Sequence, residues 1–191
     1  TVTETVNTGG AVRIKTETVY TSDGAYVSSV KDQFGNATTY TNDKQTGAVT
    51  YVTSPNGLIT VNGYDASKSK LTSVTAGNTK VSYDYGNDNR LDSIVFADKN
   101  NSSKYEKFVF GYDNFGRILT TKVGTKELST NEYTNGILTR SEYGNGDAVS
   151  YDYTYAGLTS AVYQHNNAEN DKPAYIWQYS SNGTPRMHQD G

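Results

Sequence analysis

A short motif recurs along almost the whole chain, and it constrains the fold more than any other feature. A tyrosine is followed by a polar turn that ends near a glycine, and then by a segment of alternating polar and apolar residues, as in FGYDNFGRILTTKV at 110–123. Self-similarity at a fixed period is typical of repeat proteins, in which each unit packs on its neighbours. Eight copies begin at tyrosines that are 20 to 27 residues apart, namely Tyr20, Tyr40, Tyr64, Tyr85, Tyr112, Tyr133, Tyr153 and Tyr179.

Each copy holds two turns, and this pattern predicts β-hairpins. A second turn precedes the next tyrosine, as in SPNG at 54–57, and Asn-Gly pairs supply the positive φ of tight hairpin turns. Two turns in each copy leave strands of about 6–8 residues. In VSYDY, residues 81–85, the apolar side chains share one face, whereas LTSVT at 71–75 breaks the alternation and predicts a bulge or a strand end. We predict an all-β chain of consecutive antiparallel β-hairpins that form one curved, spiralling sheet.

The composition agrees with a sheet whose faces are partly exposed to solvent. The chain has 17 tyrosines, whose rings add apolar area while their hydroxyls tolerate water. It has no cysteine, which excludes disulfides, thiolate metal sites and thiol nucleophiles. The net charge is −3, there is no basic stripe, and no apolar run approaches the length of a membrane span. We therefore expect no cofactor, no metal, no nucleic-acid partner and no insertion into a membrane.

Acidic residues recur with the motif, which favours a structural role for them. Asp65, Asp84, Asp113 and Asp152 each stand beside a repeat tyrosine. An aspartate at the start of a turn can accept a hydrogen bond from the backbone N–H two residues further on. A catalytic centre needs one acid and not one in every repeat, so we predict Asx-turns at these positions.

Other candidate sites are weaker. The stretches DYGNDN at 84–89 and HNNAENDK at 165–172 are rich in oxygen ligands, but they lack the spacing of a calcium loop, and calcium binding is left open. His165 and His188 are expected on different loops, with no nucleophile motif nearby. No catalytic constellation is present, and the sequence therefore predicts that the chain is not an enzyme.

One aromatic strip is the best candidate for a ligand-binding surface. In AYIWQYS, Tyr175, Trp177 and Tyr179 alternate with other residues and would share one face of a strand. Neighbouring rings would be about 6.6 Å apart along that strand. Such a strip can stack on sugar rings, but it can equally pack against the next hairpin.

Written as Y-D-x-x-G-R-(L/I), the motif resembles the YD repeat of Rhs-type proteins. The best matches are YDNFGRIL at 112–119, YGNDNRL at 85–91, DQFGNAT at 32–38 and GDAVSYDY at 146–153. The resemblance implies a shell of β-hairpins that in bacterial members encloses a C-terminal toxin. The aspartate-containing core segment that closes such shells is not recognisable here, so neither a cleavage site nor a toxin domain is implied.

Two functions follow as expectations. The first is a structural segment, spanning 1–191 as a single repeat region of about eight hairpins, cut from a larger secreted or cell-surface protein. Its partner is then the rest of the same polypeptide, including shell and enclosed domain. The alternative is an extracellular module that binds carbohydrate or a partner through Tyr175, Trp177 and Tyr179.

Overall fold

The computed structural model describes residues 2–7, 13–166 and 173–190, and these form seventeen strands and no helix. The chain divides into two compact units, residues 1–84 with 94–105 and residues 85–93 with 106–191. The boundary passes through the strands β9 (Leu91–Asp98) and β10 (Asn101–Tyr112). Among the described residues there is no helix that is long and apolar enough to cross a lipid bilayer.

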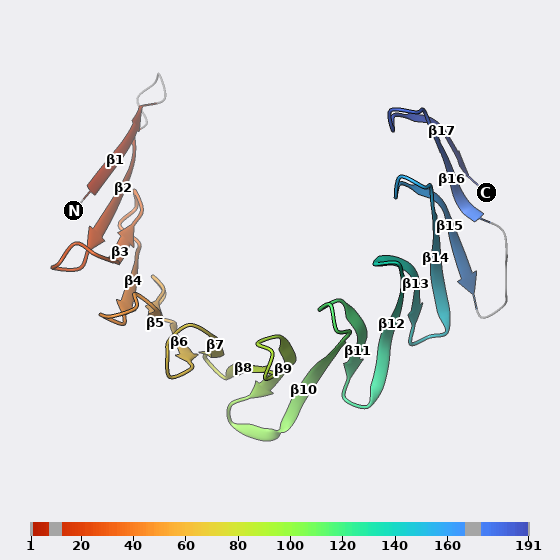
Figure 1. Ribbon diagram of the computed structural model, residues 1–191. Helices are drawn as coiled ribbons and strands as arrows, with labels where there is room; N and C mark the ends of the chain where they lie inside the picture. The colour runs from red at the N-terminus through yellow and green to blue at the C-terminus, as the bar shows by residue number, and fades with distance from the viewer. Residues whose placement is uncertain (1, 8–12, 167–172, 191) are drawn as a thin grey trace. The chain divides into compact units, whose positions relative to one another are not determined.

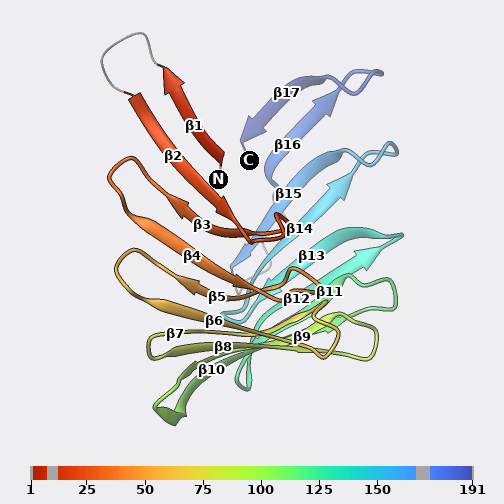
Figure 2. The same ribbon diagram turned by 90° about the vertical axis from the view of Figure 1, so that its left-hand side faces the viewer.

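The first unit contains a run of short antiparallel strands in which each strand pairs with the one before it (Figures 1 and 2). Alternating Thr, Val and Tyr residues give these strands their extended backbone. The strands are β1 (Val2–Asn7), β2 (Arg13–Tyr20), β3 (Val27–Lys31), β4 (Ala37–Asn42), β5 (Val49–Thr53), β6 (Ile59–Tyr64), β7 (Leu71–Ala76) and β8 (Thr79–Tyr85).

The second unit repeats this arrangement. From β11 onward every strand is antiparallel to its predecessor. The strands are β11 (Ile118–Val123), β12 (Lys126–Thr134), β13 (Ile137–Tyr143), β14 (Asp147–Tyr153), β15 (Thr159–Asn166), β16 (Pro173–Tyr179) and β17 (Pro185–Asp190). The prediction of an all-β chain of consecutive antiparallel hairpins is confirmed.

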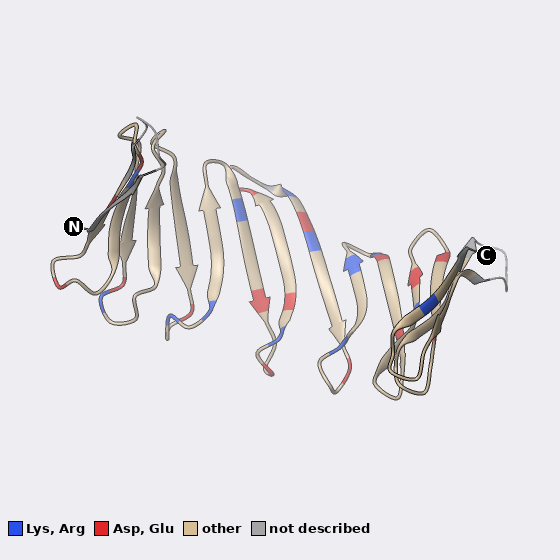
Figure 3. Cartoon of the chain, turned by 90° about the horizontal axis from the view of Figure 1, so that it is seen from above, with Lys and Arg blue, Asp and Glu red and all other residues tan. Residues whose placement is uncertain are grey.

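The strands alternate between two sets of turns. We call the set that follows the repeat tyrosines the tyrosine turns; they are residues 21–26, 43–48, 65–70, 86–90, 113–117, 135–136, 154–158 and 180–184. The opposite turns include 54–58, 77–78, 124–125 and 144–146. Charged residues of both signs are interspersed over strands and turns (Figure 3).

A β-bulge accompanies every tyrosine turn whose pairing is defined. The register shifts at the last residue of the preceding strand, or in β12 at Tyr133 one residue before the strand ends. This leaves one extra residue near the start of the next strand. The extra residues are Ser28, Thr50, Thr72, Leu119, Thr139, Ser160 and Arg186. Three of these hydroxyls, those of Ser28, Thr50 and Thr139, donate to a carbonyl on the partner strand. The bulge predicted within 71–75 is confirmed at Thr72.

The sheet has almost no buried core. Among the described residues, the buried hydrophobic side chains are those of Ala148 and Ala161, and no large side chain is fully buried. A sheet of this kind cannot gain its stability from a central hydrophobic cluster. The contacts between successive hairpins must supply it, as in other repeat proteins.

Candidate functional site

The repeat tyrosines tie each hairpin to the hairpin before it. The hydroxyl of Tyr153 donates to the carbonyl of Leu138 at 2.7 Å, and Leu138 lies at the start of the preceding hairpin's second strand. Four other tyrosines make the same contact. The pairs are Tyr64 with Val49, Tyr112 with Leu91, Tyr133 with Ile118, and Tyr179 with Thr159, at 2.7 to 3.1 Å. This recurring hydrogen bond explains why the motif requires tyrosine and not phenylalanine.

The second copy of the motif departs from the pattern. Its bulge lies beside Asn42, so Asn42 and not Tyr40 occupies the position of the repeat tyrosine. The side-chain amide of Asn42 donates to the carbonyl of Gly47 within the same turn. Anchoring this copy at Tyr40 was therefore wrong by two residues.

The last residue of a tyrosine turn lies against the glycine of the next tyrosine turn. Arg117 shows the contact most fully: its guanidinium is 4.5 Å from the centroid of the Tyr133 ring and lies beside Gly136. Arg90 repeats this on the preceding pair, 5.7 Å from the Tyr112 ring, and also donates to the Asp113 carbonyl at 2.8 Å. The arginine of the motif thus joins its hairpin to the next one. Where arginine is absent, Tyr26 lies against Gly47, and Leu158 against Gly183.

The aspartates of the motif fall into two groups. Asp113 accepts from the N–H groups of Phe115 and Arg117 at 2.8 and 2.9 Å, as an Asx-turn requires. Asp65 also begins a turn, but its side chain accepts from backbone N–H groups four and five residues further on. Asp84 and Asp152 lie in strands β8 and β14, so the Asx-turn prediction is wrong for them. In these two copies the aspartate precedes the repeat tyrosine, so it lies in the strand before the turn begins.

The turn aspartate Asp65 makes stability depend on pH. Hydrogen bonds from the Ser67 hydroxyl and the Lys70 N–H lower the pKa of Asp65 from 3.8 to about 2. A pKa lowered by folding adds stability above 3.8 that is lost as the pH falls towards about 2. We expect the melting temperature of Asp65→Asn to depend less on pH over this range than that of the parent chain. A thermal melt series checks this, with Glu106→Gln as the control; identical pH profiles for all three chains would contradict it.

The structure brings two of the three residues of the predicted aromatic strip into ring contact. Tyr175 and Trp177 lie together, with ring centroids 5.9 Å apart, and His188 of β17 completes a cluster of three rings. The His188 ring is stacked on Tyr175 at 5.7 Å and tilted against Trp177 at 5.3 Å. Tyr175 and His188 are exposed, whereas Trp177 is half-buried. Tyr179 instead donates its hydroxyl to Thr159, as a repeat tyrosine does.

Sequence reasoning missed His188, although a signal for it was present. The pair 182–183 is an Asn-Gly turn, and counting outwards from that turn brings His188 opposite Trp177. Both histidines were expected on loops, but the backbone places His165 in β15 and His188 in β17, so that expectation was wrong. The turn gives β17 a partner, and pairing then extends the strand through His188.

The candidate calcium loop at 84–89 lies wholly within the described residues, whereas the one at 165–172 lies there only in part. In 84–89, Asp88 pairs with Arg90 at 3.2 Å, so one potential ligand is engaged by a cation. Most of the stretch 165–172 lies outside the described residues. In the described part of the chain, no group of three or more His, Asp or Glu side chains is placed to hold a metal ion.

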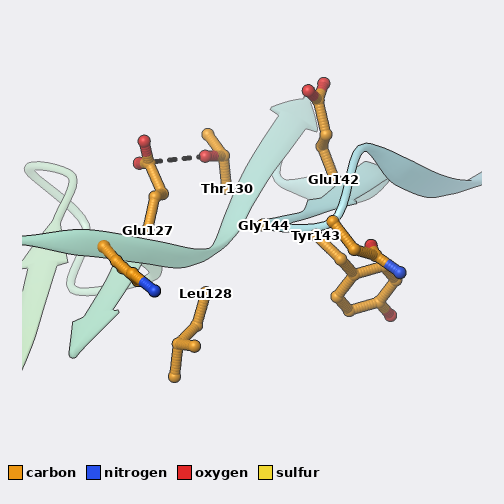
Figure 4. A pocket seen from close by; sticks show the side chains of 8 residues that line it. Glu127, Leu128, Thr130, Glu142, Tyr143 and Gly144 are labelled. Carbon is orange, nitrogen blue, oxygen red and sulfur yellow. Dashed lines mark hydrogen bonds between the residues drawn. The ribbon is translucent and has the colours of Figure 1, made fainter. Parts of the chain in front are cut away.

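An open hollow of about 820 Å³ lies in the second unit beside the opposite turn 144–146. Figure 4 shows Glu127 and Thr130 on one side of β12, joined by a hydrogen bond of 3.1 Å, with Leu128 directed away from them. Glu142, which also lines the hollow, is 3.6 Å from the guanidinium of Arg140. The carboxylates of Glu127 and Glu142 are exposed, and each already contacts a neighbouring side chain. Glycoside hydrolysis instead uses two carboxyl groups that converge on the bond to be broken.

The fold belongs to a known class. No protein-family model and no curated protein matches the sequence. A mutant Tc holotoxin pore of Photorhabdus luminescens contains a chain that matches 92% of this chain with a TM-score of 0.68 and 11% sequence identity. This chain spans 12% of the length of that one. Two crystal structures of TcdB2-TccC3 proteins match at 11% identity, with TM-scores of 0.36 and 0.35, over 97% of this chain and 14% of theirs.

The likeness to the holotoxin is one of fold. The chain has the hairpin-repeat fold of YD-repeat, Rhs-type proteins, as the motif predicted. The alternation of tyrosine turns with opposite turns, and the bonds from each hairpin to the one before it, are the local features that build this fold.

Proposed function

We propose that the chain is a structural segment, without catalytic activity of its own, in the β-hairpin wall of a larger secreted or surface protein. The observation that carries the proposal is the hydrogen bond from a repeat tyrosine to the preceding hairpin, which recurs five times. Such a contact can extend a sheet by one hairpin at a time without a central core. The fold shared with a Tc holotoxin chain supports the same conclusion.

In this proposal, the partner of the chain is the rest of its own polypeptide. The whole of 1–191 acts as one repeat region, and the wall surrounds or presents another domain. Electron cryo-microscopy of the longer polypeptide tests this directly. We expect the hairpins to form part of the wall of a hollow body, and a separate compact domain at this place would contradict the proposal.

A second candidate function rests on the ring cluster of Tyr175, Trp177 and His188. Tyr175 and His188 are exposed and Trp177 is half-buried. Aromatic rings held together in this way can stack on the apolar faces of sugar rings. In this alternative the cluster binds extracellular glycans. Tyr179 makes no direct contact with the glycan, because its hydroxyl bonds to the Thr159 carbonyl within the sheet.

Replacing Trp177 tests the second candidate. If the cluster binds glycans, Trp177→Ala should lower the affinity about tenfold or more, because alanine loses the whole ring contact and about 1.4 kcal/mol corresponds to tenfold. A glycan array with a parallel thermal melt measures both binding and folding. Tyr155→Ala, at a fully exposed turn residue, is the control. Unchanged binding in a folded Trp177 variant, or no glycan binding by the parent chain, would refute this function.

A further inference from the structure

The chain contains five Asn-Gly pairs, at 56–57, 62–63, 135–136, 145–146 and 182–183. This dipeptide is chemically reactive, because the backbone nitrogen of the glycine can attack the side-chain amide carbon of the asparagine. Glycine offers the least steric hindrance to that attack. The reaction requires the two groups to be free to approach each other, so the hydrogen bonds of each pair decide its rate.

Four of the pairs are held by hydrogen bonds. The pair at 62–63 lies inside β6, where the Asn62 amide donates to the Val49 carbonyl at 2.9 Å. In the turns at 56–57, 145–146 and 182–183, the glycine N–H donates to the carbonyl three residues before it, and the asparagine side chain accepts from the N–H two residues after it. The partners are Ser54 and Leu58, Tyr143 and Asp147, and Ser180 and Thr184.

The pair at 135–136 differs from the others. It forms the two-residue tyrosine turn between β12 and β13, with φ of +50° at Asn135 and +87° at Gly136, as a type I′ turn requires. Both residues are exposed. Within the described ranges, neither the Asn135 side chain nor the Gly136 N–H makes a hydrogen bond. The two reacting groups are therefore free of the bonds that hold the other pairs.

A cation lies beside this turn. An Nη atom of Arg117 is 3.7 Å from the point where a Cβ on Gly136 would stand. The guanidinium is fixed there by the Asp113 carboxylate and by the Tyr133 ring. A positive charge at this place favours loss of the amide proton of Gly136, because it stabilises the anion that forms on the backbone nitrogen.

We propose that Asn135 is the site of a spontaneous, time-dependent deamidation of this chain. Hydroxide removes the amide proton of Gly136, and the nitrogen bonds to Cγ of Asn135. The Cγ–Nδ2 bond breaks, and ammonia leaves with a proton taken from water. Water then opens the five-membered imide at either carbonyl, which gives aspartate or isoaspartate at position 135.

The product changes the turn in two ways. A new carboxylate appears at position 135, next to the glycine that Arg117 lies against, and adds a negative charge to this turn. Isoaspartate also adds a carbon to the backbone of this two-residue turn, and hairpin geometry depends on the length of the loop. The modification thus loosens the hairpin of β12 and β13 as the protein ages.

Incubation of the purified chain at mildly alkaline pH tests the proposal. Peptide mapping by mass spectrometry, with isoaspartate methyltransferase as a second probe, gives a separate rate for each of the five asparagines. We expect Asn135 to react about tenfold faster than each of the other four, which is the effect of two hydrogen bonds of ordinary strength. In urea, where the turns are lost, the five rates should converge.

The variant Arg117→Gln isolates the contribution of the cation. It should slow the reaction of Asn135 in the folded chain and leave its rate in urea unchanged, while Arg140→Gln, on β13, serves as the matched control. If Arg117→Gln does not fold, the comparison among the five asparagines of the parent chain still decides the matter. A folded-state rate for Asn135 that equals or falls below those of the other pairs would overturn the proposal.

Discussion

Gly144→Asn is expected to destabilise the chain by about 2–4 kcal/mol, because a side chain at this position meets backbone that cannot move aside. Gly144 lies in the opposite turn between β13 and β14, and its N–H donates to the Leu128 carbonyl at 3.0 Å. A Cβ on Gly144 would overlap with the carbonyl oxygen of Glu127. The substitution therefore forces the two neighbouring hairpins apart and removes their backbone hydrogen bond.

Gly157→Asn is the matched control for this prediction. Gly157 has a φ of +77°, a conformation that asparagine tolerates, and no atom lies within 4 Å of its added Cβ. We expect a loss of less than about 1 kcal/mol there. Urea unfolding of both variants gives the two free energies, and equal losses would mean that close approach of hairpins at Gly144 is unimportant.

The second large effect is expected from removing the tyrosine hydroxyls of the second unit together. Tyr112, Tyr133, Tyr153 and Tyr179 each donate to the preceding hairpin. Phenylalanine keeps the ring but removes the hydroxyl that donates to the accepting carbonyl, at a cost of about 1 kcal/mol for each bond. Successive repeat tyrosines are two strands, or about 10 Å, apart, so we expect their effects to add and the fourfold variant to lose about 4 kcal/mol.

A second fourfold variant controls for the general effect of adding phenylalanine. It carries the same substitution at exposed tyrosines whose hydroxyls make no hydrogen bond in the described part of the chain: Tyr105, Tyr143, Tyr155 and Tyr175. We expect this variant to unfold within about 1 kcal/mol of the parent chain. If urea unfolding showed the same loss for both variants, the bonds to the preceding hairpin would not carry the stability.

Much of the fold was predictable, because the motif is local. The alternation of 81–85, the Asn-Gly turns and the spacing of the tyrosines each specify a hairpin without knowledge of distant residues. The irregular segment 71–75 even indicated the bulge at Thr72. The recurrence of that bulge was not recognised, since Ser28 and Thr139 look like ordinary strand residues in the sequence.

The contacts between hairpins could not be predicted in the same way. The stagger of one hairpin on the next decides that Arg117 reaches Tyr133 and that Tyr26 reaches Gly47. Periodicity within a strand carries no information on that stagger. The role of Tyr179 could not be predicted for the same reason. The sequence places Tyr179 on one face with Trp177, but the hydrogen bond from its hydroxyl to the Thr159 carbonyl depends on how the neighbouring hairpin is placed.

Hydrogen exchange of Tyr133→Phe tests most directly the claim that each hairpin is held by the one before it. The lost bond joins β12 to the start of β11. In a repeat protein stabilised by neighbours, exchange should accelerate in strands β11–β13 and stay unchanged in β2–β7 of the first unit. Equal acceleration in both units would show that the chain is stabilised as one cooperative unit. No acceleration anywhere would show that the tyrosine hydrogen bond contributes no stability.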